Sequence, residues 1–193
     1  MNFDWLDRRP IIVAIAGPNG AGKTTFFSAH VAPAGLRFVS ADDLARHLEL
    51  SPYQGAVVAA SLRDELVRTR ESFIFETVFS DPVGDKLQFL KDAAAVGYHV
   101  VLCFIGLNST DLSEQRVAMR VAQGGHDVPS EKLKHRFPRT MANLKKATRD
   151  LPHVMVFDNS DLSAPFRQIA IFEDGKLIDR GTSLPTWFAQ IVS

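Results

Sequence analysis

Residues 11–25 read Ile-Ile-Val-Ala-Ile-Ala-Gly-Pro-Asn-Gly-Ala-Gly-Lys-Thr-Thr and decide the fold class of this 193-residue chain. The apolar run at 11–16 is typical of a strand that is buried on both faces. A complete G-x-x-x-x-G-K-[ST] pattern follows, and then a segment at 23–30 that can form a helix. Strand, glycine-rich loop and helix in this order are the context in which the pattern binds phosphate. The sequence therefore predicts a binding loop for a nucleoside triphosphate, against the alternative of a glycine-rich turn that binds nothing.

The residue types of this loop suit the chemistry of a triphosphate. Its glycines permit positive φ angles that turn N–H groups toward phosphate oxygens, and the positive dipole end of the following helix points at the same anion. Lys23 is expected to reach the β- and γ-phosphates of ATP, and the Thr24 hydroxyl is expected to bind Mg²⁺. The residues predicted to contact the nucleotide are Gly17, Pro18, Asn19, Gly20, Ala21, Gly22, Lys23, Thr24 and Thr25.

Strand-like and helix-like segments alternate along the rest of the chain, which is typical of an α/β domain around a parallel sheet. Further strands are predicted at 37–40, 72–76, 98–105 and 153–158, and helices at 42–50, 53–70, 83–96, 110–123 and 130–149. A C-terminal hairpin at 169–178 and a short helix at 183–192 complete the pattern. We predict a P-loop NTPase of three α/β/α layers, with a mainly parallel five-stranded sheet, in a single domain over residues 1–193.

Composition narrows the classes of function. Lys+Arg 22 and Asp+Glu 22 balance to zero formal net charge, which disfavours nucleic acid and anionic membrane as partners. No stretch is long enough to span a bilayer, and the N-terminus does not resemble a signal peptide. The one cysteine, Cys103, lies in an apolar run, so a core position in a cytoplasmic protein is expected. The six histidines are scattered without metal-ligand spacing, which leaves Mg²⁺ carried by the nucleotide as the expected metal.

Acidic residues follow two of the predicted strands. Asp42 and Asp43 come after the second strand, and Glu76 and Thr77 close the third. In open α/β sheets ligands bind beyond the carboxyl ends of the strands, so these side chains should share one crevice with the glycine-rich loop. Asp42 is predicted to accept the proton of an acceptor hydroxyl, and Glu76 with Thr77 to bind the acceptor or a water on magnesium. The competing interpretations are that an aspartate caps the next helix, and that strand ends are polar because they reach solvent.

Two basic helices are predicted to form a lid over about 116–143. Arg116, Arg120 and Gln123 share one face of the first helix, which Gly124-Gly125 should end. The second helix has an apolar stripe and a basic-polar stripe, the latter formed by Lys132, Arg136, Arg139 and Asn143. Arginines in such a lid can neutralise the charge on a transferring phosphoryl group, although an exposed basic face is often merely solvated. Pro138 is expected to kink or divide the second helix.

Taken together, these segments resemble the short zeta-toxin-like P-loop kinases over nearly the whole chain. The particular matches are 14–25, Phe38 to Asp42, Ser72 to Thr77, Gln123 to Pro129 and Asp158 to Ser160. The resemblance implies an adenylate-kinase-like sheet with a helical lid, and transfer of the ATP γ-phosphoryl group to a sugar hydroxyl of UDP-N-acetylglucosamine. Position by position, Asp42 matches the catalytic base, Glu76 and Thr77 match the acceptor-binding pair, and Arg120 and Arg136 match the lid arginines.

The leading hypothesis is therefore a magnesium-dependent kinase that acts on a small, nucleotide-sugar-like acceptor. A second hypothesis is a toxin–antitoxin component that acts mainly through binding of a protein antitoxin. A third is a regulatory ATPase switch without an acceptor, which would not need Asp42. A nucleic-acid end kinase is disfavoured, because the chain is neutral and lacks interleaved aromatic and basic residues.

Overall fold

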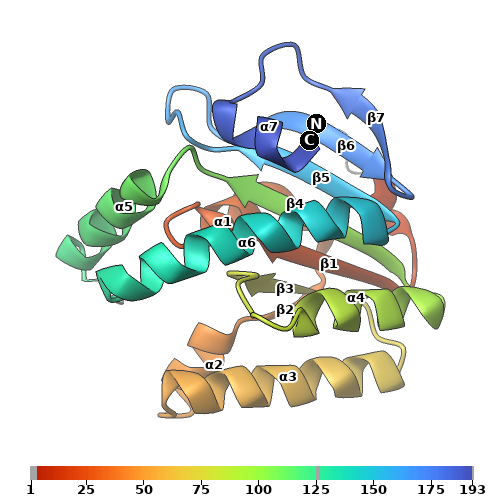
Figure 1. Ribbon diagram of the computed structural model, residues 1–193. Coiled ribbons are helices and arrows are strands. Elements are labelled where there is room, and N and C mark those ends of the chain that lie inside the picture. Colours follow the sequence, from red (N-terminus) through yellow and green to blue (C-terminus); the bar gives the residue numbers. More distant parts are fainter. Residues whose placement is uncertain (1–3, 125–126, 193) are drawn as a thin grey trace.

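A computed structural model describes residues 4–124 and 127–192 and places one sheet at the centre of the molecule (Figure 1). Its seven strands lie in the order β2-β3-β1-β4-β5-β6-β7. The strands are β1 (Ile11–Ala16), β2 (Arg37–Val39), β3 (Phe73–Thr77), β4 (His99–Gly106), β5 (His153–Asp158), β6 (Arg167–Glu173) and β7 (Lys176–Arg180). Strands β1 to β5 are parallel, and the last two pair antiparallel. The fold class is confirmed.

The predicted number of strands is wrong, because the C-terminal hairpin joins the sheet. Strand β6 pairs with β5 from His153↔Glu173 to Asp158↔Arg167, and β7 pairs with β6. The physical reason is the open edge that β5 would otherwise present, since an unpaired edge leaves backbone N–H and C=O groups without partners. Strand β7 is exposed along its whole length and forms the new edge.

The helices are α1 (Lys23–Phe26), α2 (Ala41–His47), α3 (Pro52–Arg68), α4 (Asp85–Ala95), α5 (Thr110–Ala122), α6 (Ser130–Asp150) and α7 (Thr186–Val192). Serine side chains cap the beginnings of three of them, α2, α3 and α5. Ser51 and Gln54 form a capping box at α3, and the Ser109 hydroxyl accepts a hydrogen bond from Leu112 N at α5. None of the helices in the described ranges has the length and apolar character that a membrane crossing requires.

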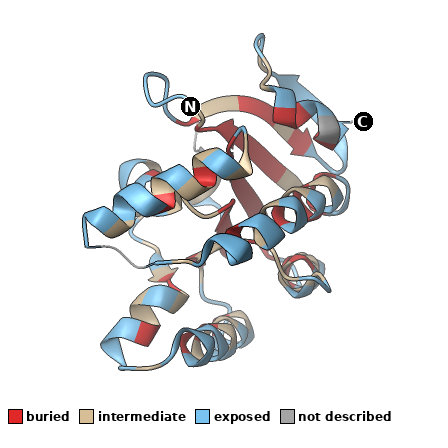
Figure 2. Cartoon of the chain, turned by 60° about the vertical axis from the view of Figure 1, so that its left-hand side comes forward, coloured by how far each residue is buried: buried red, intermediate tan, exposed pale blue. Residues whose placement is uncertain are grey.

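Strand β1 holds the centre of the core, because all six of its residues are fully buried. Its alternate residues face opposite sides. Ile12, Ala14 and Ala16 join a cluster that includes residues of α3, α4, α6 and α7. Ile11, Val13 and Ile15 join a second cluster that includes Phe26 and Val31. Buried positions accordingly follow the sheet and the inward faces of the helices (Figure 2). The loop after β1 therefore starts from the most rigid part of the protein.

Helix α6 runs without interruption through Pro138, so the expectation that this proline divides the helix is wrong. The proline removes one N–H and leaves the Lys134 carbonyl without its helical partner. Pro138 and Lys134 are both exposed, so water can satisfy that carbonyl. One continuous helix consequently carries Arg136 on one side of Pro138 and Thr140 on the other.

Candidate functional site

The glycine-rich loop lies at the carboxyl end of β1, between β3 and β4, where the strand order reverses. Gly17 has φ 146°, and a Cβ atom there would lie 2.2 Å from the Ile105 carbonyl oxygen, so no other residue fits. Helix α1 begins at Lys23. Within residues 4–124 and 127–192, the N–H groups of Gly20, Gly22 and Lys23 donate no hydrogen bond. Donors left free at the start of a helix fit a bound phosphate.

Side chains from two other elements hold this loop in shape. Ser113 Oγ, on α5, donates to the Asn19 carbonyl at 2.6 Å. Asn159, which follows β5, donates from Nδ2 to the Ala21 carbonyl at 2.9 Å and accepts from Phe166 N at 3.3 Å. The sequence offered Asn159 only as part of a family resemblance, and it gave no signal for Ser113. Both contacts fix loop carbonyls and so leave the loop N–H groups available to a ligand.

The amine of Lys23 lies over the loop and donates to the carbonyls of Gly17 at 3.0 Å and Pro18 at 3.1 Å. Burial lowers the pKa of Lys23 from 10.5 to about 8. Neutral carbonyls replace only part of the hydration that a buried ammonium loses. The amine is therefore held where an added negative charge would stabilise it.

Four charged side chains act on the Lys23 amine from separate parts of the chain. After burial, the largest influence on its pKa is Glu76, which raises it; Arg120 lowers it, Asp42 raises it and Arg136 lowers it. All four are among the catalytic and acceptor-binding residues predicted from the sequence, which also include Lys23 itself and Thr77. The fold therefore brings one charged residue from each of four elements within electrostatic reach of the phosphate-binding lysine. These elements are β3 at its end, α2 at its start, α5 and α6.

Two oxygen-bearing side chains lie together beside the loop. Thr24 Oγ1 donates to Glu76 Oε2 at 3.1 Å, because the parallel pairing of β1 with β3 sets Ile15 opposite Glu76. Hydroxyl and carboxylate oxygens are the donors that Mg²⁺ prefers. Among the residues that the structure describes, no group of three or more His, Cys, Asp or Glu side chains could hold a metal alone. The pair fits a magnesium ion that arrives with a nucleotide.

The two aspartates after β2 differ in their surroundings. Ser40, not an aspartate, caps α2 by accepting from Asp43 N at 3.2 Å, so the capping interpretation is wrong. The Asp43 carboxylate pairs with Arg46. The Asp42 side chain is exposed, and its carboxylate has no hydrogen bond or ion pair within the described ranges. Ser40 occupies the N-cap position, from which a side chain can reach the N–H three residues on, whereas Asp42 and Asp43 lie inside the first turn.

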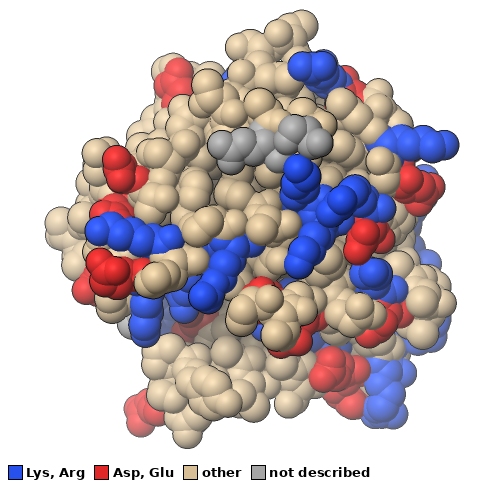
Figure 3. Space-filling view, viewed as in Figure 1, with Lys and Arg blue, Asp and Glu red and all other residues tan. Residues whose placement is uncertain are grey.

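A cavity of about 510 Å³ opens next to Glu76 and is lined by Tyr53, the loop Thr77 to Pro82, Lys86, Arg136 and Arg139. A second cavity of about 340 Å³ continues from it along α6, past Lys132 and His135. Lysine and arginine side chains gather on the face that α6 crosses (Figure 3). Thr77 lines the cavity, and its hydroxyl also accepts from Phe79 N at 3.0 Å. No sequence signal pointed to Tyr53 or Lys86. The volume and charge suit a small anionic molecule.

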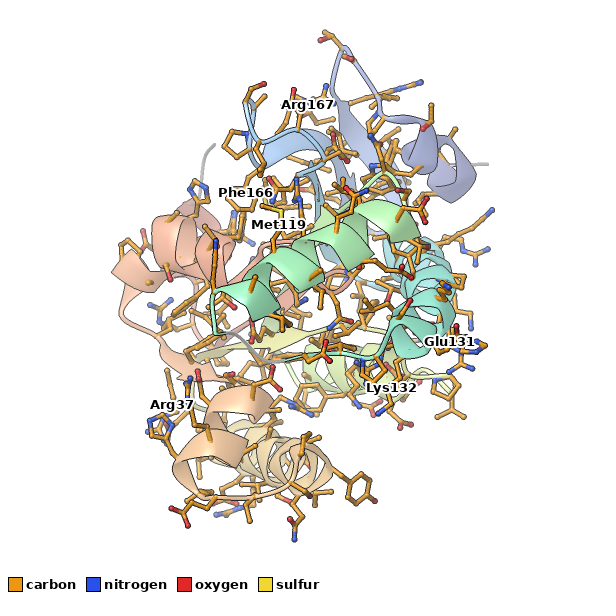
Figure 4. The ribbon with its side chains drawn as sticks, turned by 90° about the vertical axis from the view of Figure 1, so that its left-hand side faces the viewer. Arg37, Met119, Glu131, Lys132, Phe166 and Arg167 are labelled. Atoms are coloured by element: carbon orange, nitrogen blue, oxygen red, sulfur yellow. The ribbon has the colours of Figure 1, made fainter. Side chains whose placement is uncertain are left out.

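Side chains from both helices of the predicted lid contact the body of the protein. On α5, Arg116 Nη2 donates to the Ser160 carbonyl at 3.1 Å. On α6, Asn143 of the basic-polar stripe is only 5% exposed, so this stripe is buried at its C-terminal end. Figure 4 shows Met119 of α5 toward Phe166 and Arg167, and Glu131 and Lys132 at the start of α6 on the opposite side. The predicted hinge and family segment include Gly125 and His126, which lie outside the described residues.

Solved structures share this fold at low sequence identity. The AvrRxo1-ORF1:AvrRxo1-ORF2 complex, solved with sulphate ions, aligns with TM-score 0.73 and 16% identity over 97% of this chain; the chain spans 65% of that protein. PezAT, a chromosomal toxin–antitoxin system of Streptococcus pneumoniae, aligns with TM-score 0.57 and 16% identity over 96% of this chain and 77% of that one. A putative kinase of Chloroflexus aurantiacus aligns with TM-score 0.55 and 19% identity over 79% and 90%.

Sequence comparison is more specific. An uncharacterized protein of Haemophilus influenzae is 25% identical over 126 residues, which are 63% of this chain and 88% of that protein. The family model described as Zeta toxin matches residues 39–168, more than half of the chain. The matched segment runs from β2 to β6 and contains Asp42, Glu76, Arg120 and Arg136. This chain belongs to the zeta toxin family, with the fold of P-loop kinases.

Proposed function

We propose that this protein is an ATP-dependent kinase that transfers the γ-phosphoryl group to a hydroxyl of a small, nucleotide-sugar-like acceptor. The observation that carries the proposal is the convergence of Glu76, Arg120, Asp42 and Arg136 on the Lys23 amine. Opposite charges at one phosphate-binding loop suit two tasks of phosphoryl transfer. Carboxylates hold the attacking hydroxyl, and cations stabilise the transferring group. The AvrRxo1-ORF1:-ORF2 complex, which has a similar fold, has been solved with ATP.

Each charged residue has a proposed task. Asp42 accepts the proton of the attacking hydroxyl, for which its exposed carboxylate near Lys23 is suited. Arg120 and Arg136 stabilise the negative charge of the phosphoryl group in flight. Thr24 and Glu76 would hold Mg²⁺, which neutralises the β- and γ-phosphate oxygens when it is bound with ATP. The parts of α5 and α6 within about residues 116–143 belong to the proposed lid, and the whole chain is proposed to form a single domain.

The acceptor is proposed to occupy the cavity of about 510 Å³ beside Glu76 and Thr77. Its lining combines an exposed aromatic ring, Tyr53, with the cations of Lys86 and Arg139. An aromatic ring suits stacking on a base, and cations suit phosphates. A UDP-sugar such as UDP-N-acetylglucosamine has both groups and is the first acceptor to test. We propose the cytoplasm, where ATP is available, as the site of this activity.

The test is a screen of the purified protein with labelled ATP and Mg²⁺ against nucleotide sugars, nucleosides and phosphorylated cofactors. The matched pair is Asp42→Asn and Asp43→Asn, which are adjacent and isosteric but differ in their surroundings. Asp42→Asn should retain ATP binding and lose transfer by roughly 10²–10⁴-fold, the usual contribution of a positioned base. Asp43→Asn should transfer nearly as fast as the parent, because its carboxylate pairs with Arg46. If labelled inorganic phosphate is the single labelled product with every acceptor, and Asp42→Asn does not change its rate of release, a regulatory ATPase is favoured.

A second candidate function is partnership with a protein antitoxin. The structural likeness to PezAT, a toxin–antitoxin system, supports it, and the two proposals are compatible. The test is co-expression with the product of any small reading frame beside the gene, followed by ATP titration of the complex. Loss of ATP binding in a stable complex supports an antitoxin that occludes the loop. Full ATP binding and transfer in the complex contradicts it.

A further inference from the structure

The loop after β3 has a backbone conformation that its own sequence does not favour. Phe79 has φ 61°, in the left-handed region, although it is a bulky residue with a side chain only 1% exposed. Such a conformation persists only when surrounding contacts hold it, and strained residues of this kind are enriched at functional sites. The hydrogen bond from Phe79 N to the Thr77 hydroxyl supplies one contact from within the loop. The loop carbonyls must find their partners elsewhere.

Two side chains of α6 supply those partners. Thr140 Oγ1 donates to the Val78 carbonyl at 2.8 Å. Asn143 Nδ2 donates to the carbonyls of Phe79 at 2.9 Å and Asp81 at 3.0 Å. Thr140 is fully buried and Asn143 is 5% exposed, so water does not replace these bonds. We name Thr140 and Asn143 the α6 clasp. The clasp satisfies three carbonyls of a loop that lines the cavity of about 510 Å³.

The clasp also shares a helix face with Arg136. Positions 136, 140 and 143 are spaced i, i+4 and i+7, which places them on one side of α6. Arg136 lines the same cavity as the loop and acts on the charge of Lys23. Because α6 is continuous through Pro138, Arg136 and the clasp lie on one helix. A displacement of the loop relative to this helix therefore changes the distance between the loop and Arg136.

We propose that Thr140 and Asn143 are positioning residues, which hold the acceptor loop in register with Arg136 for phosphoryl transfer. This inference rests on the proposed kinase function. Neither side chain lines the cavity in which the acceptor is proposed to bind. Their effect is exerted through the loop that lines the cavity and through Thr77, whose hydroxyl accepts from Phe79 N. It should therefore appear in the use of the acceptor and not in ATP binding.

The competing interpretation is that the clasp is an ordinary part of the core, and α6 offers a matched control. Thr148 is on the same helix and is 3% exposed, but its Oγ1 donates only to the Lys145 carbonyl of its own helix. Thr140→Val and Thr148→Val therefore remove the same buried hydroxyl, with and without a link to the loop. Thr140→Ser keeps the hydroxyl and should rescue activity. Asn143→Ala tests the second half of the clasp, and Thr140→Val remains informative if that variant does not fold.

Steady-state kinetics with the acceptor found by the screen gives the first readout. Thr140→Val should lower kcat/KM for the acceptor by roughly 10–100-fold with Kd for ATP within about twofold, since small misplacements of reacting groups are costly. Thr148→Val and Thr140→Ser should match the parent. Equal loss in Thr140→Val and Thr148→Val, or loss of ATP binding in step with transfer, overturns the proposal.

Hydrogen exchange of the backbone amides gives a second readout that needs no acceptor. Exchange in 78–86 should be faster in Thr140→Val than in Thr148→Val, with the glycine-rich loop at 17–25 unchanged. Faster exchange at 78–86 with normal transfer overturns the positioning role and leaves the kinase proposal intact. A parent protein that transfers phosphoryl to no acceptor refutes the kinase proposal, and with it the role in transfer. Equal exchange in the two variants then refutes the clasp as well.

Discussion

Lys23 should take up a proton when this protein binds ATP in alkaline solution. Burial sets the pKa of its amine at about 8 in the free protein. At that pKa about half of the amine is neutral at pH 8, about a tenth at pH 7 and about nine tenths at pH 9. The negative phosphates of bound ATP favour the ammonium form and raise its pKa again. The expected uptake is therefore roughly 0.1, 0.5 and 0.9 protons at pH 7, 8 and 9.

The sign of the pH dependence follows from proton linkage. The complex binds more protons than the free protein above pH 8, so ATP affinity should fall there by up to about tenfold per pH unit. Calorimetric titration of ATP in buffers of different ionisation enthalpy measures the uptake directly. The control is Lys23→Arg, because a guanidinium stays charged throughout this range and should show no uptake. Uptake below about 0.1 proton at pH 9 would refute the argument, since it would mean a fully charged amine in the free protein.

Three further predictions concern the lid arginines, the hydrogen bond of Asn159 to the glycine-rich loop, and stability in acid. Arg136→Ala should lower kcat by about 10³–10⁵-fold with little change in KM for ATP, and Arg136→Lys should not restore kcat. If Arg136→Ala and Arg120→Ala both show the steady-state kinetics of the parent, both arginines are merely solvated. Asn159→Ala should lower the free energy of unfolding by about 1–3 kcal/mol in urea titrations, because it strands the buried Ala21 carbonyl, and an unchanged midpoint would contradict that cost. Burial, with the nearby charges of His153 and Arg8, lowers the pKa of His99 to about 4, below its value in the unfolded chain. The contribution of neutral His99 to the free energy of unfolding is therefore complete above about pH 6.5 and is lost as the pH falls toward 4. Urea midpoints measured across this range should fall in the same way, and His99→Gln should flatten the dependence.

Local signals predicted most of the elements, because each was contained within a few residues. The apolar run at 11–16 is β1, and the segment at 153–158 is β5, at the same bounds. Ser51 with Gln54 and Ser109 stop their helices from starting earlier, since each cap satisfies an N–H within three residues. These choices depend on neighbours in sequence, so a single sequence contains the information.

The errors arose where a distant segment decided the outcome. The hairpin joined the sheet because β5 offered it an edge, which no residue of the hairpin reports. The burial of Asn143, which the basic-polar stripe did not predict, goes with its hydrogen bonds to carbonyls of the loop after β3. In each case the partner is far away in sequence.

The sequence by itself determined that this protein has a phosphate-binding loop, because strand, glycines, Lys23 and Thr24 are contiguous and their chemistry is local. Only the tertiary structure decided that Asp42, Glu76, Arg120 and Arg136 act on that lysine together. Their meeting depends on the strand order β2-β3-β1-β4, which sets the ends of three segments beside one loop. Burial of apolar strands selects that order over the whole chain, and no short pattern encodes it.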